Sequence, residues 1–219
     1  MARRKSDPTD TPAPPDSADS LADREATILE ELHLIRRRQV MTVATEIFAE
    51  RGYHDTTVNE IAARLGVGKP YIYGFFRSKE DLLSAAASQG TCAVHDAVIR
   101  EAATGGSPVD ILRRISSAFT RSALENHRSV QVYFRDNIYL PKKVRTELSD
   151  KRREIDRTVK SVIDRGVSEG VFDVSDSHLC SLLIAGMMSY SFAWYSPKAG
   201  FDIDHICAEV SERVVKVVL

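Results

Sequence analysis

The sequence predicts an all-α protein that folds as two helical domains. Apolar residues recur at intervals of three and four along most of the chain, and no stretch shows the apolar–polar alternation of a strand. Glycine and proline stand between these stretches, where helices are expected to begin or end. With 219 residues, 43% of them hydrophobic, the chain can bury a substantial core.

Three segments differ in composition and periodicity. Residues 1–19 are rich in Pro, Asp, Ser and Thr without any periodicity, which predicts a disordered tail. Residues 20–83 contain three helical stretches, of which the last two are short and closely spaced. Residues 84–219 contain longer helical stretches and are expected to form the second domain.

The first helix is expected to begin near residue 20 and to end at Gly52. Its apolar residues have the spacing of one helix face, namely Val40, Ala44, Ile47 and Phe48. Gly52 stands where a helix C-cap favours glycine. This apolar face is expected to pack on the two short helices that follow.

Residues 56–79 (TTVNEIAARLGVGKPYIYGFFRSK) predict two short helices around a tight turn. Ile61 and Leu65 lie one turn apart and give the first of these helices an apolar face. Either Thr56 or Thr57 suits its N-cap, since a hydroxyl can accept a hydrogen bond from a free backbone N–H.

The second short helix is expected to run from about residue 68 to 76, after a turn at Gly66. Such a turn needs a positive φ, which glycine adopts at low cost. Ile72 and Phe76 share a face of this helix and should point into the core. Four residues are then left on its other faces: Lys69, Pro70, Tyr71 and Tyr73.

A short, basic and aromatic helix after such a turn fits the major groove of DNA. The alternative is a helical hairpin within a core, whose tyrosines only pack. The next residues favour the first interpretation, because Arg77 and Lys79 flank Ser78, the expected N-cap of a longer helix. A helix N-terminus beside two basic residues suits a phosphate group.

The charge distribution agrees with a nucleic-acid-binding segment, although the net charge is −1. Residues 33–80 carry eight Lys or Arg and five Asp or Glu, whereas residues 1–32 carry four basic and eight acidic residues. Positive charge is thus concentrated where DNA would bind. Within residues 33–80, Arg36 and the two arginines that follow it either contact the DNA backbone or form a solvated face.

The stretch IAARLGVGKPYIYGFFRSKEDLL resembles the signature of the TetR family of bacterial transcriptional regulators. The resemblance covers residues 39–83 and, more loosely, the layout of the whole chain. It implies a three-helix domain that binds operator DNA and a helical C-terminal domain that binds a small molecule and forms a dimer. By this resemblance the groove-facing residues are Lys69, Pro70, Tyr71 and Tyr73, and the phosphate contacts are Thr56, Thr57 and Lys79.

Three positions depart from the common pattern of that family. Gly68 stands where Ser or Thr usually caps the recognition helix, Gly74 where Tyr is common, and Phe75 where His is common. Because of these departures, the resemblance does not predict the base sequence of the operator or all of the phosphate contacts. The expected fold is unaffected.

The second domain is expected to contain a long helix over residues 78–104, which would act as a lever between the domains. Further helical stretches cover residues 108–124, 128–140, 142–170, 179–194 and 203–217. The last two are too apolar for one subunit to cover, which predicts a homodimer through these helices. The alternative is a monomeric core.

Aromatic and flexible side chains concentrate in two parts of the second domain and predict a pocket for a small hydrophobic effector. The candidates are Phe119, Tyr133, Phe134, Asn137, Met188, Phe192 and Trp194. Most of them could equally form plain core. Asn137 is the exception, since a polar side chain on an aromatic stretch needs a partner.

A basic cluster over residues 142–153 has two interpretations. It is either a solvated helix face or, through residues such as Arg152, a site that neutralises a phosphorylated effector. The stretch GMMSYSFAWYSPKAGFDIDHI is similar to TetR-family members that sense acyl-CoA compounds. This resemblance implies an acyl-CoA thioester as the effector.

Catalytic and metal-binding patterns are absent from the sequence. The six histidines are scattered, no nucleophile or nucleotide motif occurs, and the three cysteines lie far apart. We therefore expect no enzyme, no metal and no cofactor, and a cytoplasmic protein without signal peptide or membrane span. The alternatives to a ligand-released repressor are a ligand-independent DNA-binding protein and, less favoured, a small-molecule carrier or enzyme.

Overall fold

The computed structural model describes residues 17–197 and 200–219, and these residues form helices without any strand. The all-α prediction is therefore confirmed. The chain divides into two units, residues 1–39 and 40–219. The predicted tail falls mostly on residues 1–16, which lie outside the described residues.

Helix α1 (Ser17–Arg51) begins slightly before the expected start and runs through both units. In the first unit, residues 23–39 are almost all exposed, including five large apolar side chains: Ile28, Leu29, Leu32, Leu34 and Ile35. The second unit begins at Val40, and from there the predicted apolar stripe of α1 is buried.

Residues 40–51 of α1, together with α2 (Val58–Leu65), α3 (Lys69–Tyr73) and the start of α4 (Lys79–Ala103), share one apolar core. Ile61, Ile72 and Phe76 are almost completely buried in it, as predicted. Gly66 ends α2 with a φ of 69°, a left-handed conformation that favours glycine. The turn between α2 and α3 thus follows from the local sequence.

Helix α3 is shorter than the expected 68–76 helix. Gly74 follows it, and the N–H groups of Phe75 and Phe76 both donate to Ile72 O. This extra turn directs Phe76 into the core although the regular helix has ended.

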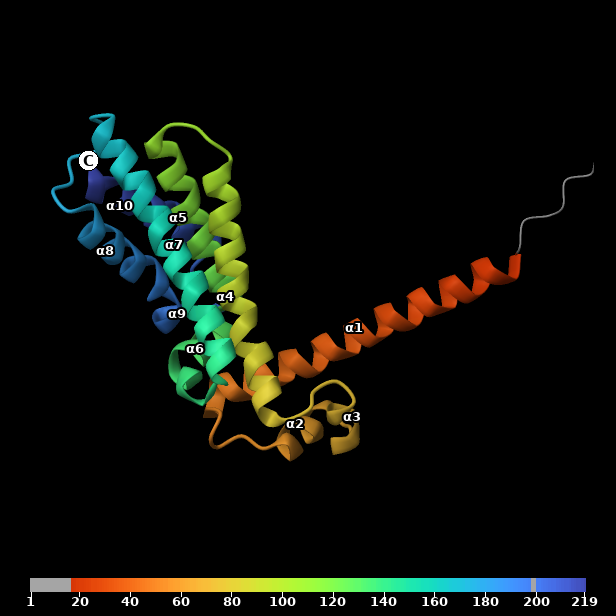
Figure 1. The fold of residues 1–219 in the computed structure, drawn as a ribbon. Helices are drawn as coiled ribbons and strands as arrows, with labels where there is room; N and C mark the ends of the chain where they lie inside the picture. The colour runs from red at the N-terminus through yellow and green to blue at the C-terminus, as the bar shows by residue number, and fades with distance from the viewer. Residues whose placement is uncertain (1–16, 198–199) are drawn as a thin grey trace, which may run out of the picture. The chain divides into compact units, whose positions relative to one another are not determined.

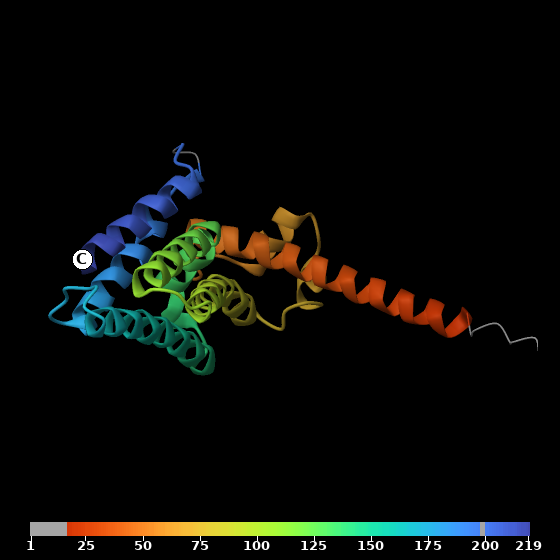
Figure 2. The same cartoon turned by 90° about the horizontal axis from the view of Figure 1, so that it is seen from above.

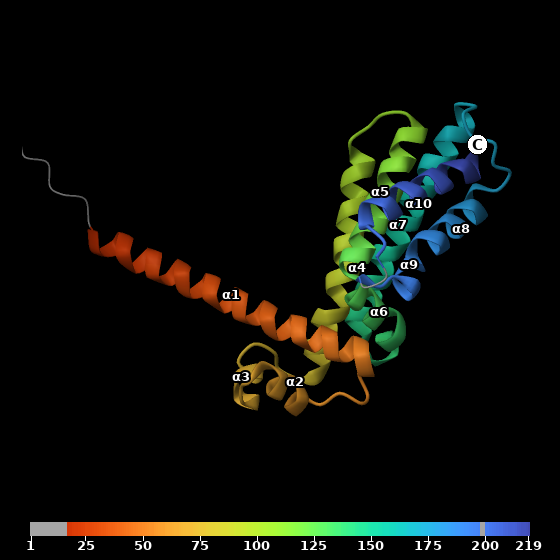
Figure 3. The same cartoon turned by 180° about the vertical axis from the view of Figure 1, so that it is seen from behind.

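The remaining helices form a bundle (Figure 1). They are α4, α5 (Pro108–Glu125), α6 (His127–Asp136) with the 3-10 turn η1 (Asn137–Tyr139), α7 (Lys142–Ser168), α8 (Ser177–Ser189), α9 (Ser191–Trp194) and α10 (Ile203–Val218). Seen along the bundle, α8 and α10 lie together on the side opposite α4 (Figure 2). From behind, α10 crosses α5, against which it packs (Figure 3).

The second apolar core lies among α4, α5, α7, α8 and α10. The predicted single helix over 179–194 is wrong, because the structure separates α8 from α9 at Tyr190. The hydroxyls of Ser189 and Ser191 donate to backbone carbonyls of Ala185 and Met188. Such local hydrogen bonds compete with regular helix bonds and favour a break.

Candidate DNA-binding face and effector cavity

The N-terminus of α2 is fixed by a capping box. Glu60 N–H donates to Thr57 Oγ1 at 3.3 Å, and Thr57 N–H donates to Glu60 Oε2 at 2.7 Å. The hydrogen bond from Thr57 N–H to the Glu60 carboxylate, followed by the one from the Thr57 hydroxyl, lowers the pKa of Glu60. Because Thr57 accepts the capping bond, it is the N-cap among the two candidates, and its side chain is exposed.

Thr56 has a structural role in this conformation. Its side chain is completely buried, and its hydroxyl donates to Gly52 O at 2.7 Å. The expected phosphate contact through the Thr56 side chain does not fit this geometry, because the group closes the turn after α1. Sequence alone did not separate two adjacent threonines that point in opposite directions.

Helix α3 presents three of its four predicted groove-facing side chains to solvent. Lys69 and Pro70 are exposed, and Tyr73 is 49% exposed. Tyr71 is half-buried, with its ring centroid 5.2 Å from that of Phe75. Helix α3 thus exposes a cation and an aromatic ring to solvent. A single α-helix is narrow enough to enter the major groove of DNA.

Lys79 and Tyr53 form a cationic corner beside the start of α4. Lys79 Nζ lies 4.2 Å from the Tyr53 ring centroid and 3.4 Å from His54 O. Burial, followed by the charge of Glu80 and a hydrogen bond to it, raises the pKa of Tyr53 to about 12. The phenol is therefore neutral at physiological pH, and Lys79 keeps donor capacity for a phosphate oxygen. Arg36 lies on α1 in the first unit and is exposed.

A small cavity lies in the bundle among α4, α5, α6, α7 and α8, with a volume of about 60 Å³. Four of the eight predicted effector residues line it: Phe119, Tyr133, Phe134 and Arg152. The structure thus brings together residues from α5, α6 and α7 that are distant in the sequence.

The other four predicted residues do not line this cavity. Met188 is buried in the second core, and Trp194 is 52% exposed. The Phe192 ring stacks on that of Phe134, with centroids 4.9 Å apart, so it supports the cavity wall from outside. Asn137 Nδ2 donates to Phe134 O at 3.1 Å, so its partner is the backbone of its own turn.

None of the remaining lining residues was predicted from the sequence; they are small, apolar and a few polar residues: Thr91, Val94, Ala123, Val130, Ile155, Asp156, Ala185 and Ser189. Helical spacing was the signal that could have found some of them, because residues 123 and 156 lie one turn after the predicted residues 119 and 152. Asp156 is the acid of the cavity, and burial raises its pKa against the opposing influence of Arg152 and then of His178.

Arg152 stands at this cavity over two aromatic rings. Its guanidinium carbon lies 5.7 Å from the Tyr133 ring centroid and 5.1 Å from that of Phe134. Among the described residues, no carboxylate lies within ion-pair distance of it. Its neighbour Arg153, by contrast, pairs with Asp150 at 2.7 Å.

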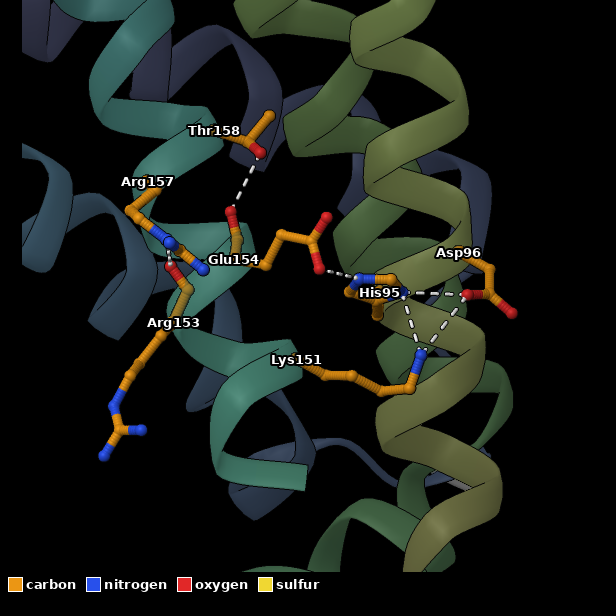
Figure 4. Close-up of polar contacts among 7 residues, drawn as sticks. All are labelled: His95, Asp96, Lys151, Arg153, Glu154, Arg157 and Thr158. Carbon is orange, nitrogen blue, oxygen red and sulfur yellow. Dashed lines mark hydrogen bonds and ion pairs between the residues drawn. The ribbon is translucent and has the colours of Figure 1, made fainter. Parts of the chain in front are cut away.

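His95 joins α4 to α7 next to the cavity (Figure 4). Its Nε2 lies 2.9 Å from Glu154 Oε2 and its Nδ1 lies 2.8 Å from Asp96 Oδ1. Lys151 Nζ approaches the same Nδ1 at 3.4 Å. The hydrogen bond from His95 is the first cause that lowers the pKa of Glu154.

The side of the bundle that carries α8 and α10 exposes apolar residues on both helices: Leu179, Leu182, Leu183, Met187, Val217 and Leu219. An exposed apolar patch of this kind is typical of a protein–protein interface.

Residues 17–197 and 200–219 show no grouping of His, Cys, Asp and Glu that could hold a metal ion. No helix in this part of the chain is long and apolar enough to cross a membrane.

Two family models match the chain. Residues 40–86 match the model for bacterial regulatory proteins of the tetR family. Residues 105–218 match the model for the tetracyclin repressor-like C-terminal domain. Together they cover the DNA-binding face and most of the cavity.

Individual proteins are also similar to this chain in sequence or in fold. Over 47 residues the chain is 49% identical to the HTH-type transcriptional activator FasR of Mycolicibacterium smegmatis, a match that spans 22% of this chain and 22% of FasR. The ketosteroid transcriptional regulator KstR2 of Mycobacterium tuberculosis has a similar fold (TM-score 0.78, 22% identity, 84% of this chain and 94% of KstR2). So does AibR, solved with isovaleryl coenzyme A and operator DNA (TM-score 0.68, 19% identity, 84% of this chain and 97% of AibR).

Proposed function

Because the chain belongs to the TetR family of bacterial transcriptional regulators, we propose that it is a repressor that binds a palindromic operator as a homodimer and leaves it when an effector binds. The observation that carries this proposal is the combination of an exposed α3, bearing Lys69 and Tyr73, with a cavity in the adjoining bundle. A regulator of this kind needs both features in one chain.

We assign operator binding to accessible residues of the first three helices and to Lys79 at the start of α4. Lys69, Pro70 and Tyr73 would enter the major groove, with Tyr71 contributing its exposed part. Thr57 and Lys79 would contact phosphates, since one offers an accessible hydroxyl and the other an ammonium group. Arg36 remains a candidate backbone contact because it is cationic and exposed.

The effector that fits best is an acyl-CoA thioester. The cavity wall is largely apolar and suits an acyl chain. Arg152 lies beside it and, among the described residues, has no carboxylate within ion-pair distance, so its guanidinium could bind a phosphate or another anion. AibR, which has a similar fold, was solved with isovaleryl coenzyme A. At about 60 Å³ the cavity is far smaller than the roughly 300–1,000 Å³ of typical ligand sites, so it must widen on binding.

The mechanism we propose is a population shift. The effector would favour a conformation in which α4, the lever, moves the two DNA-binding heads out of register with the operator. By linkage, effector and operator then weaken each other's binding by the same factor.

The dimer would form through the exposed apolar residues of α8 and α10, packed against the same helices of a second copy. Two α3 helices could then reach successive major grooves, about 34 Å apart.

The deciding experiment measures binding to DNA from upstream of the protein's own gene, with and without acyl-CoA thioesters of increasing chain length. Specific, salt-dependent binding that a thioester releases would support both the repressor and its effector class. Specific binding that no thioester disturbs would support a ligand-independent DNA-binding protein. Absence of specific binding at any salt concentration would overturn the proposal and favour a carrier.

A second candidate is an activator, which the name of the relative FasR favours. A promoter–reporter fusion in cells with and without the gene distinguishes the two. Deletion raises the reporter signal for a repressor and lowers it for an activator.

A further inference from the structure

Helix α6 contacts both the cavity and the C-terminal end of α1. Tyr133 and Phe134 line the cavity, and Tyr133 also belongs to the core shared by α1, α2, α3 and the start of α4. The next two residues, Arg135 and Asp136, bind the segment that follows the buried stripe of α1. Four consecutive residues therefore connect the effector cavity to the DNA-binding helices.

Arg135 caps the end of α1. Its Nη1 donates to Ala49 O at 3.1 Å and its Nη2 donates to Phe48 O. The last carbonyls of a helix lack intrahelical donors, and a cation there also opposes the partial negative charge of the helix end. A planar guanidinium can serve two carbonyls at once, which a lysine ammonium does less well.

Asp136 holds the turn after α1. Its buried carboxylate accepts a hydrogen bond from Tyr53 N–H at 3.3 Å and pairs with Arg135 Nη2 at 3.1 Å. The Tyr53 ring lies over Lys79 and 5.3 Å from the ring of Tyr139 in η1. Asp136 therefore fixes the backbone that positions the cationic corner beside α4.

Helix α6 is also joined to α4 and to the C-terminal part of α1. Ser129 Oγ accepts from Gly90 N–H at 2.7 Å, and a Cβ at position 90 would lie only 2.9 Å from that oxygen. Arg128 pairs with Glu46 of α1 at 2.5 Å. A shift of α6 is therefore transmitted to both helices that hold the DNA-binding face.

We infer that Arg135 and Asp136 are positioning residues that couple the cavity to the DNA-binding face. When the cavity widens, Tyr133 and Phe134 are displaced, and the pair next to them releases or reorients the end of α1. Coupling through α6 thus operates beside the lever α4. This inference rests on the proposed function only in its effect on operator binding. The release of the Tyr53 amide can be measured on the protein without DNA.

The experiment uses the full chain and replaces the unidentified effector by a side chain. Ala185→Leu fills the cavity from α8, and Ala185→Val is the smaller substitute if the leucine variant does not fold. Arg135→Met removes the cap of α1, and Arg135→Lys is the conservative variant. Arg153→Met, at an exposed arginine of α7, is the matched control. Hydrogen–deuterium exchange of residues 49–57 and operator affinity are measured for each single variant and for Ala185→Leu combined with Arg135→Met.

We expect Ala185→Leu to speed exchange of the Tyr53 amide and to weaken operator binding about tenfold, the scale of ordinary allosteric coupling. Arg135→Met should produce both effects alone, and the double variant should add little to it. Arg135→Lys should restore part of the affinity, and Arg153→Met should change neither quantity.

Unchanged exchange at Tyr53 in both cavity-filled variants, or additive losses in the double variant, would overturn the inference. If exchange responds as expected while no variant, including the wild type, binds operator, the proposed function fails and the coupling stands.

Discussion

Tyr73 illustrates how one exposed residue of α3 gains a function from its neighbours. Ile72, next to it, is completely buried and holds α3 against the core, so the Tyr73 ring points outward on a rigid base. An aromatic side chain has few rotatable bonds, and fixing it in a groove costs little conformational entropy. The same holds for Pro70, whose ring is already rigid.

Replacing Tyr73 by alanine should weaken operator binding about tenfold or more without loss of the dimer. The change removes base contacts worth about 1–3 kcal/mol, while the buried face of α3 is untouched. Fluorescence anisotropy on a labelled operator measures the affinity, and light scattering measures the mass.

The control for Tyr73 is Lys143→Ala, whose side chain is 88% exposed on α7. Equal operator affinity of wild type and Tyr73→Ala would show that α3 is not the recognition helix.

The residues of the DNA-binding face were predictable because their signal is local. Capping, the glycine turn and the inward Ile72 and Phe76 all depend on residues within a few positions of each other. Thr56 escaped prediction because its role depends on a hydrogen bond to Gly52, at the end of another helix. Sequence spacing alone does not say which of two threonines faces the solvent.

At the scale of helices, boundaries set by caps were predictable and cavity lining was only partly so. Ser78 begins α4 as expected and Ser107 begins α5 in the same way, since each accepts a hydrogen bond from the backbone N–H three residues on. The cavity instead needs five helices to meet, and small residues such as Ala123 and Ala185 carry no aromatic signal. Aromatic content therefore predicted only three of the lining residues, Phe119, Tyr133 and Phe134, and Trp194 lies outside this cavity.

The hydrogen bond between His95 of α4 and Glu154 of α7 makes the free energy of unfolding sensitive to acid. Glu154 has a lowered pKa in the folded state, first because it accepts a hydrogen bond from His95. Its contribution to stability is therefore complete above its ordinary pKa of 4.5 and is lost as pH falls through the lowered value. Glu154→Gln should reduce the melting temperature at neutral pH, and this difference should shrink below pH 4.5.

Glu147→Gln, on the same helix, is the matched control, since Glu147 pairs with exposed Lys143 at 4.0 Å. Thermal melts of the three proteins across this pH range check the prediction. Parallel profiles for both variants would contradict a special contribution from the His95 contact.

At the scale of the whole molecule, the exposed apolar residues of α8 and α10 decide the oligomeric state that we propose. Leu183 is 60% exposed on α8 although it is a large apolar side chain. A carboxylate there would be desolvated in an interface without a partner, at a high cost in free energy.

Leu183→Asp should therefore give a folded monomer whose operator affinity falls about 100-fold or more, because the two heads no longer bind together. Size-exclusion chromatography with light scattering gives the mass, and anisotropy gives the affinity. Ile28→Asp, at an apolar residue of α1 that is 54% exposed, is the control and should leave both unchanged. A Leu183→Asp protein that remains dimeric would place the interface elsewhere.

The small cavity also bears on how fast an effector can bind. A guest larger than about 60 Å³ fits only after the wall has moved, and Phe134, whose ring stacks on that of Phe192, belongs to this wall. If this opening precedes binding, the observed association rate rises with effector concentration only until it equals the opening rate, and then levels off. At high effector concentration the motion of the bundle, and not the supply of effector, would then limit the speed of binding.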